Sequence, residues 1–319
     1  MAITLSEVQL NTTDALCAQV IDEFRKSSFL LDKLPFDDAV SPYGGAAMTY
    51  AYNRVSMPPM ASTRAINAEF VPHEAKKERH TVELKVLGGS FNIDRVLAQM
   101  GGMTDEVQFQ MSQKIKATQA LFADMVINGD KDADATGFDG LDKALRDTAT
   151  EWNADGLALS SSANVTSNYM DFLDLLDMAI GSMDGAPTCL MGNSPMIARL
   201  RACARRSTMY QMSLNDWGQP VECYGAIPFV DLGEKPGSND PIIGMNDSGK
   251  SDLYIVRFGL DGFHGVSVSG QSPIRTWLPD FTTSGAVKTG EVEMIAAVAL
   301  KSTKAAAVIR NINVIGHVE

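Results

Sequence analysis

Residues 104–130 read TDEVQFQMSQKIKATQALFADMVINGD and carry the clearest secondary-structure signal in the chain. The stretch opens with Thr104, which can cap a helix, followed by two acidic residues in the first turn, where the helix dipole favours negative charge. Five apolar residues fall on one helical stripe: Val107, Met111, Ile115, Phe122 and Val126. Asn128-Gly129 ends the pattern. The sequence therefore predicts a helix over 104–128, about 35 Å long, with this stripe as its core face.

The stretch before this helix, residues 46–87, has the pattern of a long hairpin. Apolar residues alternate with polar or small ones at both of its ends, at Met48, Tyr50 and Tyr52 and again at His80, Val82, Leu84 and Val86. Between them lie three prolines and a charged run. Such a hairpin buries little against its own domain and needs a partner surface. The apolar residues expected to make that contact are Met57, Met60, Ile66 and Phe70.

The rest of the chain divides into an N-terminal arm and a mixed block. The arm, residues 1–45, combines a weak helix around 13–27 with a segment that prolines keep extended. Further helices are predicted from Tyr169 to Ile180 and from Ser194-Pro195, a cap followed by proline, to about Arg206. The predicted strands are Thr188–Met191, Val221–Tyr224, Ile227–Asp231, Leu253–Phe258, Val292–Leu300 and Ala305–Val314.

Composition excludes several classes of protein. The chain has 319 residues, of which 45% are hydrophobic and 21% charged, so it can bury a large core. It has no apolar run long enough to span a membrane, so no membrane association is expected. Four cysteines without close spacing favour free thiols in a reducing compartment. The net charge of −12 repels phosphates on average, which argues against a DNA-binding protein.

One segment matches a nucleotide-binding motif in full. Gly244-Met245-Asn246-Asp247-Ser248-Gly249-Lys250-Ser251 fits the pattern of a loop that cradles phosphates, with Lys250 on the outer oxygens. That loop should open a helix, whereas Leu253–Phe258 is β-branched and aromatic, as in a strand. A polar turn between strands is the favoured interpretation, and a P-loop nucleotide hydrolase using Gly244–Ser251 is the alternative.

Other patterns that could carry chemistry are weaker. Asp130, Asp132 and Asp134 have the spacing of calcium ligands, but the later glycine and glutamate positions hold Ala135 and Leu141, so only weak divalent binding is expected. The four histidines are too scattered for a metal cluster or a catalytic triad. We therefore predict no catalytic residue, no metal site and no cofactor.

Three short stretches, taken with the order of the elements, resemble one family. Val126-Ile127-Asn128-Gly129-Asp130 is followed by Gly137-Phe138-Asp139-Gly140-Leu141. Further on come Tyr224-Gly225-Ala226-Ile227-Pro228-Phe229-Val230-Asp231, and then Leu253–Gly259 with Gly262–Gly265. Along essentially the whole chain the order of parts resembles the major capsid proteins of tailed bacteriophages with the Hong Kong 97-type fold.

The resemblance implies an α+β capsid fold with five parts. Residues 1–45 would be the N-terminal arm and 46–87 an extended E-loop hairpin lying over a neighbouring subunit. Residues 88–165 would form a P-domain with its spine helix at 104–128, and 166–284 an A-domain. Residues 285–319 would be C-terminal strands that return to the P-domain.

The resemblance also implies a function without catalysis. The chain would assemble as pentamers and hexamers into an icosahedral shell that encloses phage DNA without sequence-specific binding. Its expected partners are further copies of itself, a separate scaffolding protein, a portal and a decoration protein. The expected location is the virion capsid, assembled in the cytoplasm of the host bacterium. An encapsulin-type nanocompartment, which encloses protein cargo, is the alternative with the same fold.

Overall fold

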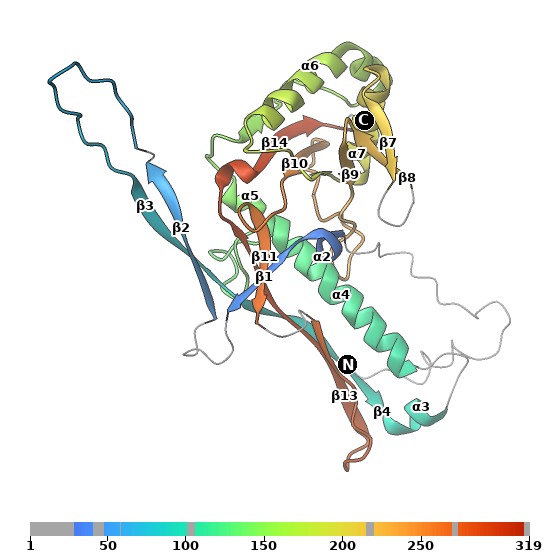
Figure 1. Cartoon of the computed structure of the whole chain (residues 1–319). Coiled ribbons are helices and arrows are strands. Elements are labelled where there is room, and N and C mark those ends of the chain that lie inside the picture. Colours follow the sequence, from blue (N-terminus) through green and yellow to red (C-terminus); the bar gives the residue numbers. More distant parts are fainter. Residues whose placement is uncertain are drawn as a thin grey trace.

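The structure is a computed structural model that describes residues 29–40, 48–57, 59–100, 106–214, 220–269 and 274–315 (Figure 1). Most of the predicted arm, including the helix around 13–27, lies outside these residues, as does the capping residue Thr104.

The first sheet of the molecule is covered on one face by the long helix α4. Its strands pair in the order β1-β11-β13-β12, and β4 pairs with β13 from Val287 to Ala296. The strands are β1 (Phe36–Val40), β4 (Lys85–Asp94), β11 (Phe263–Val268), β12 (Ile274–Trp277) and β13 (Val287–Leu300). The helices near them are α2 (Phe29–Lys33), α3 (Arg95–Met100), α4 (Glu106–Asn128) and α5 (Leu141–Ala144). In Figure 1, α4 runs alongside β4 and β13, which it contacts along its length.

The helix predicted over 104–128 is α4, and its stripe faces the protein interior. Met111, Phe122 and Val126 are buried. Val107 and Ile115 are half-buried and pack at the edge of a small cluster of buried residues that includes Met111. The stripe is therefore best covered toward the C-terminal end of α4, where the helix reaches the second sheet.

The second sheet has seven strands in the order β5-β14-β10-β6-β9-β8-β7. They are β5 (Glu151–Asn153), β6 (Cys189–Met191), β7 (Tyr210–Leu214), β8 (Pro220–Tyr224), β9 (Ile227–Val230), β10 (Lys250–Val256) and β14 (Ala306–Asn313). Two helices accompany it, α6 (Ser162–Gly181) and α7 (Ser194–Arg206). α6 and α7 cover one face of this sheet, and the C-terminal end of α4 with the short α5 packs on its other face. Because α4 also packs on the first sheet, the two sheets share one hydrophobic core.

The last strand lies in a different sheet from the one that the sequence suggested. Both C-terminal strands were expected to return to the domain of α4. β13 does so, whereas β14 pairs with β10 and β5 in the second sheet. The physical reason is burial on both faces: Ala307 and Ile309 pack toward α6 and α7, and Ala306 and Val308 pack toward the end of α4. A strand that is apolar on both sides belongs in the middle of a covered sheet.

Two strands from the predicted 166–284 block also lie elsewhere. β11 and β12 pair with β13 in the first sheet, and only the segments up to β10 belong to the second. Strand pairing joins residues far apart in the chain, so a division of the sequence into consecutive blocks does not reproduce it.

The N-terminal cap of α7 lies one residue before the predicted cap, Ser194. Asn193, and not Ser194, is the cap, since its side chain accepts a hydrogen bond from the backbone of Met196 at 2.9 Å. The Asn193 amide also donates to the carbonyl of Ile243 and to the hydroxyl of Ser251. A buried asparagine with all three contacts satisfies both the helix end and its own polar atoms.

Two glycines in the turn after α4 are required by a close approach of the backbone. Gly129 accepts a hydrogen bond from the amide of Gly140 at 2.8 Å. A Cβ at Gly129 would lie 2.3 Å from the carbonyl oxygen of Phe138, and one at Gly140 would lie 2.7 Å from that of Ile127. Any larger residue would force these two chain segments apart, which explains the glycines of this motif in physical terms.

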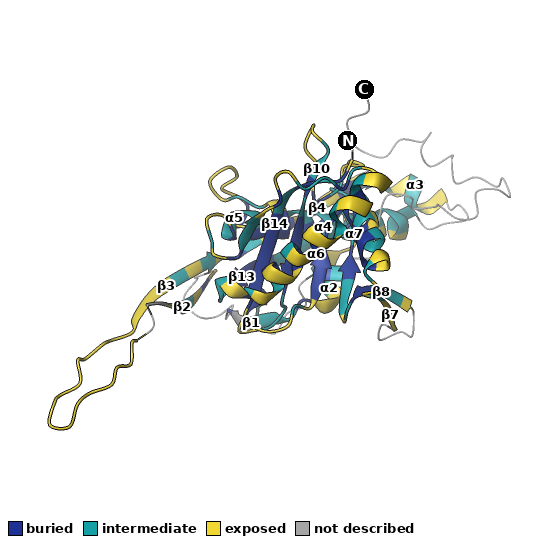
Figure 2. Ribbon diagram, turned by 90° about the horizontal axis from the view of Figure 1, so that it is seen from above, coloured by how far each residue is buried: buried dark blue, intermediate teal, exposed yellow. Residues whose placement is uncertain are grey.

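Exposure follows the same layered arrangement (Figure 2). The faces of α4, α6 and α7 that meet the sheets are buried, and their outward faces are solvated. Among the helices in the described ranges, none is long and apolar enough to cross a membrane.

Candidate functional site

The feature that stands apart from the body is the hairpin of β2 (Thr49–Met57) and β3 (Lys76–Glu83), which project side by side away from both sheets (Figure 1). Residues 59–79 are all exposed. Of the predicted contact residues, Met60 is 72% exposed, Ile66 92% and Phe70 59%. Met57 ends β2, and its side chain lies outside the described part. Met60, Ile66 and Phe70 are therefore largely exposed to solvent.

The tip nevertheless has local order. The guanidinium of Arg64 donates to the carbonyls of Ala65 and Ala68 at 3.3 and 3.1 Å. It also lies 5.2 Å from the ring centre of Phe70, a cation–π contact. Asn67 adopts the left-handed conformation at φ 67°, which asparagine tolerates better than most residues. Arg64 thus closes a turn that presents Ile66 at its apex.

The base of the hairpin, unlike its tip, is packed into the body. Tyr50 and Leu84 are buried, and they form a cluster with Val40, Val266 and Ala299 of the first sheet. We call this base, with the residues that it contacts, the hairpin seat. The hairpin is therefore a projection that is packed into the body at its base and solvated in its outer half.

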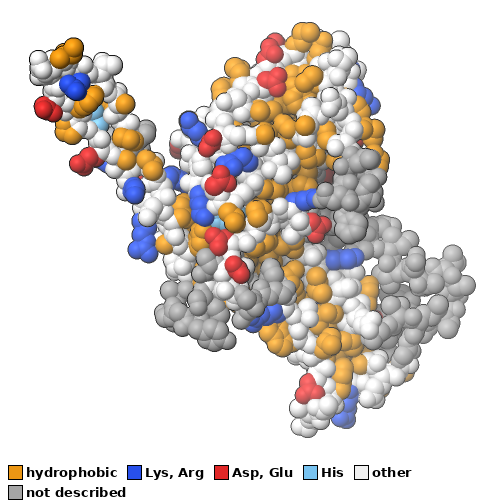
Figure 3. Space-filling model, viewed as in Figure 1, with side chains coloured by type: hydrophobic (Ala, Val, Ile, Leu, Met, Phe, Trp, Pro, Cys, Tyr) orange, Lys and Arg blue, Asp and Glu red, His pale blue; other side chains and the backbone are white. Residues whose placement is uncertain are grey.

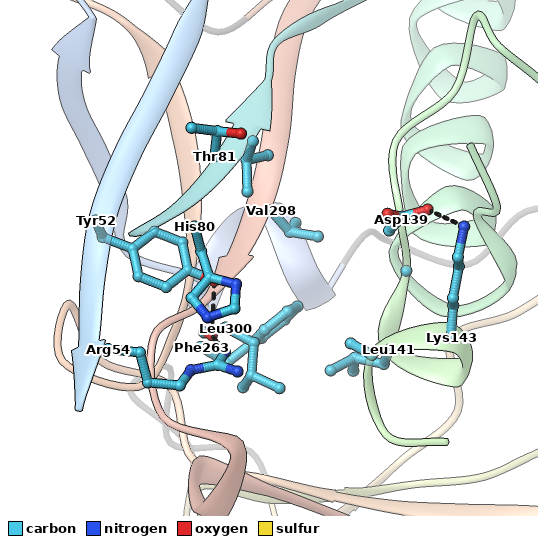
Figure 4. A pocket seen from close by; sticks show the side chains of 13 residues that line it. Tyr52, Arg54, His80, Thr81, Asp139, Leu141, Lys143, Phe263, Val298 and Leu300 are labelled. Atoms are coloured by element: carbon cyan, nitrogen blue, oxygen red, sulfur yellow. Dashed lines mark hydrogen bonds and ion pairs between the residues drawn. The ribbon is translucent and has the colours of Figure 1, made fainter. Parts of the chain in front are cut away.

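Hydrogen bonds also hold the base of the hairpin to the body, beside a cleft that Figure 4 shows. The hydroxyl of Tyr52 donates to the carbonyl of Leu300 at 3.0 Å. Arg54 donates to the same carbonyl at 2.7 Å and to that of Lys301 at 3.1 Å. The cleft has a volume of about 330 Å³ and separates the hairpin from the segment that carries α5. These bonds tie β2 to the end of β13.

Electrostatics keep the seat phenols protonated. Burial raises the pKa of Tyr50, and its 2.7 Å hydrogen bond to Asp37 raises it further. Burial also raises the pKa of Tyr52, against the opposing effect of the Arg54 guanidinium. Each phenol therefore acts as a neutral donor at physiological pH.

Sequence patterns predicted the hairpin but not its seat. The alternation of Tyr50 and Tyr52 indicated a strand, and nothing singled out Arg54. Its acceptors lie 246 and 247 residues further along the chain, so no local signal connects them. An arginine beside two tyrosines at the base of an otherwise solvated hairpin was the only available hint.

We expect Arg54→Ala to loosen the hairpin without unfolding the body. Two hydrogen bonds from a charged donor contribute about 1.5–3 kcal/mol, and loss of about 1.5 kcal/mol increases local opening about tenfold. Hydrogen–deuterium exchange of peptides that cover β2 and β3 measures this opening. Arg79→Ala, on the exposed part of β3, is the matched control and should leave exchange unchanged. Equal exchange in the two variants would contradict the assigned role of Arg54.

We compared the chain with known protein families, curated proteins and solved structures. No protein-family model matches the chain, and no curated protein matches it in sequence. Solved structures do match over nearly its full length. The holo-SrpI encapsulin complex from Synechococcus elongatus PCC 7942 gives a TM-score of 0.65 at 14% identity, covering 100% of this chain and 99% of that one. The capsid of a native GTA particle gives 0.60 at 11% identity, covering 94% of each. The capsid of Myoviridae phage XM1 gives 0.56 at 12% identity, covering 98% and 99%.

The chain has the Hong Kong 97 capsid fold. The α+β class and the fold predicted from the sequence are therefore confirmed. The similarity spans the hairpin, both sheets and α4 together, because it covers almost the whole chain.

Within this Hong Kong 97 fold, the segment Gly244–Ser251 is a turn that leads into a strand. Lys250 begins β10, with no helix after the glycine, and its ammonium pairs with Asp155 at 2.9 Å. The buried Ser251 hydroxyl accepts from Asn193 and donates to the carbonyl of Gly244. A phosphate cradle needs a helix N-terminus and a free lysine, so the nucleotide-hydrolase alternative is wrong.

The acidic loop 130–134 holds a lysine in the position that a cation would take. The Lys143 ammonium lies 2.6 Å from Asp130, 2.7 Å from Asp132 and 2.8 Å from Asp139. Hydrogen bonding to Lys143 lowers the pKa of the Asp130 carboxyl. In the described ranges, no cluster of side chains could hold a metal ion. Lys143 thus offsets part of the negative charge of the loop that the sequence suggested for weak divalent binding.

Proposed function

We propose that this chain is a phage major capsid protein whose copies form a closed shell. The observation that carries the proposal is the projecting hairpin, packed into the body at its base and apolar at its tip, on a chain with the Hong Kong 97 fold from end to end. Exposed apolar side chains gathered on a projecting tip are typical of a surface that contacts another protein.

The tip supplies apolar surface for a contact with a neighbouring subunit. In the space-filling view, hydrophobic atoms at the tip lie among charged ones (Figure 3). Full burial of an exposed side chain of this size contributes roughly 1.5–3 kcal/mol. We propose that Met57, Met60, Ile66 and Phe70 pack against the next subunit, with the surrounding charges at the rim of the contact.

The parts of the chain receive roles in the same proposal. Residues 1–45 act as the arm and 46–87 as the E-loop. The sheet with α4 acts as the P-domain, and the seven-stranded sheet with α6 and α7 acts as the A-domain at the centre of pentamers and hexamers. Each of these two units combines strands from more than one stretch of the chain. We propose them in place of the consecutive blocks 88–165, 166–284 and 285–319.

The shell would enclose phage DNA without reading its sequence. A net charge of −12 gives an average field that repels phosphates, which suits a wall that does not adsorb the packaged DNA. A scaffolding protein, a portal and a decoration protein are the proposed partners. The proposed location is the virion, after assembly in the cytoplasm of the host, and no catalytic step is assigned.

An encapsulin-type compartment is the second candidate. The match to the holo-SrpI encapsulin complex, with a TM-score of 0.65, favours it. The two candidates share subunit geometry and differ in what the shell contains.

We expect the purified protein, expressed with and without a scaffolding protein, to form pentamers, hexamers or closed shells. Size-exclusion chromatography with electron microscopy measures this assembly. Nuclease-protected DNA inside particles from infected cells supports the capsid, whereas a single enriched protein cargo supports the encapsulin. A protein that stays monomeric at micromolar concentrations under both conditions would contradict both candidates.

A further inference from the structure

The hairpin seat contains a histidine whose surroundings do not satisfy it. His264 of β11 is 0% exposed, and neither ring nitrogen has a hydrogen-bond partner within the described residues. Buried polar groups normally have partners, and an unpaired one costs free energy. His264 also lies at the junction between the hairpin and the first sheet, so a change in its charge would act on that junction.

The groups around His264 come from β1, β2 and β13 and from the segments next to β11 and β13. The ring of Tyr50, on β2, meets it edge-on with centroids 5.8 Å apart. The Tyr50 hydroxyl is already committed to Asp37 of β1. Lys301, just after β13, lies 5.5 Å from the Tyr50 ring and 3.8 Å from Asp37. Asp261 precedes β11, and Ala299 of β13 lies directly across the ladder. The charged neighbours are therefore one lysine and two aspartates.

We propose that His264 makes the hairpin seat acid-labile, so that protonation of this residue releases the base of β2 and β3 from the body. A protonated imidazole has two donors, and the closed seat offers them at most the Gly262 backbone among the described residues, so at least one N–H stays without an acceptor. Lifting the hairpin exposes the ring to water, which solvates the charge. The inference concerns the chain itself and stands whether or not the protein forms shells.

The electrostatics act in the same direction. Burial lowers the pKa of His264, and the positive charge of Lys301 lowers it further, while the Gly262 backbone, Asp37 and Asp261 oppose the shift. The closed seat therefore holds the neutral ring, and the open seat takes up a proton below the ordinary histidine pKa of 6.5. Above this pH the closed and the open seat bind equal numbers of protons, so the closed seat has its full stability. As the pH falls below 6.5, stability of the closed seat is lost.

His80 is the other histidine of the seat and must be separated from His264. It lies on β3 and stacks on Tyr52, with centroids 5.6 Å apart and planes at 22°. Its Nε2 atom is also buried without a partner among the described residues. His80 faces the cleft (Figure 4), so its ring is closer to solvent than that of His264.

Hydrogen–deuterium exchange of the full-length protein, in whatever assembly state it purifies, tests the proposal. Protection factors, which remove the intrinsic effect of pH, are compared at pH 7.5 and pH 5.5 for the amides where the hairpin joins the first sheet, at the pairing of Lys85 with Ala296 of β13. Because pH 5.5 is one unit below the ordinary histidine pKa, these factors should fall by up to about tenfold. Amides of β10 in the second sheet serve as the internal reference.

Two variants and a direct titration give the decisive outcomes. His264→Phe keeps an aromatic ring without a titrating group and should abolish the pH dependence, whereas His80→Phe should retain it. Exchange at the imidazole C2 position of the wild type should give a midpoint below 6.5 for His264, independently of how the variants fold. A midpoint at or above this value would overturn the proposal, as would an unchanged pH dependence in His264→Phe or its loss only in His80→Phe.

Discussion

Replacement of residues 58–75 by a short Gly-Ser turn is expected to yield a folded protein that no longer closes shells. The described part of this segment is fully exposed, so its removal takes almost nothing from the protein's own core. The seat, with Tyr50 and Leu84 buried, stays in place. The contact between subunits disappears with the tip, and each lost apolar side chain removes roughly 1.5–3 kcal/mol if it is fully buried in the assembly.

Circular dichroism measures whether the shortened protein folds, and electron microscopy measures whether it forms closed shells. The spectrum and thermal midpoint should stay near those of the intact chain, while full-sized particles should be absent. A triple variant with serine at Met60, Ile66 and Phe70 separates apolar contact from hairpin length, because it keeps the backbone of the tip. Stable full-sized shells from the deletion, or a subunit that fails to fold, would show that the hairpin has another role.

Arg310→Ala is expected to destabilise the body of the protein more than any single substitution at the exposed tip of the hairpin. Arg310 of β14 donates to Asp142 at 2.5 Å and to Asp252 at 3.2 Å, and it also pairs with Glu151. These side chains are only 18–28% exposed, so removal of the arginine leaves three poorly solvated carboxylates without this counter-ion. Loss of one partner of such a network costs about 3–5 kcal/mol.

The pH dependence of this loss has a defined sign. Burial opposes ionisation of Asp142, but hydrogen bonds from Arg146 and Arg310 outweigh it and lower its pKa below the ordinary 3.8. The stability from this group is present above pH 3.8 and is lost as the pH falls through the lowered pKa. Burial raises the pKa of Asp252, so protonation favours the folded form there, and more so without Arg310. The gap between wild type and variant should therefore narrow from about pH 7 toward about pH 4.

Urea denaturation at the two pH values measures this gap. Arg205→Ala is the matched control, since Arg205 is exposed at the end of α7 and its side chain donates to a backbone carbonyl within the helix. Its effect should stay within about 0.5 kcal/mol. Arg310→Lys should fall between the two, because lysine keeps the charge but not the planar fork. A gap that widens on acidification would show that the carboxylates are not the source of the loss.

The elements that the sequence predicted well are those with local signals. The helix α4 and the β2–β3 hairpin arise from periodicity, from a strong stop at Asn128-Gly129 and from clustered prolines, all of which act over a few residues. The strand that follows Lys250 was likewise predictable from β-branched and aromatic residues.

Features that depend on distant partners could not be predicted. Arg54 at the seat and Arg310 in its network each acquire their role from folding, and a sequence pattern shows only a charged residue. The sheet that β14 joins is decided by burial on both faces, a property of its neighbours as much as of its own apolar residues. Asn193 was missed because Ser194-Pro195 offers an equally good cap one residue later.

The carbonyls that hold the hairpin belong to Leu300 and Lys301, at the junction where the chain leaves one sheet and enters the other. A pull on the hairpin therefore reaches the body at a link shared by both layers. On one side the load passes into β13, whose long ladder with β4 resists sliding in shear. On the other side it passes through the short η1 (Thr303–Ala305) into β14, which lies in the interior of the second sheet. Tension on the hairpin is thus divided between the two sheets.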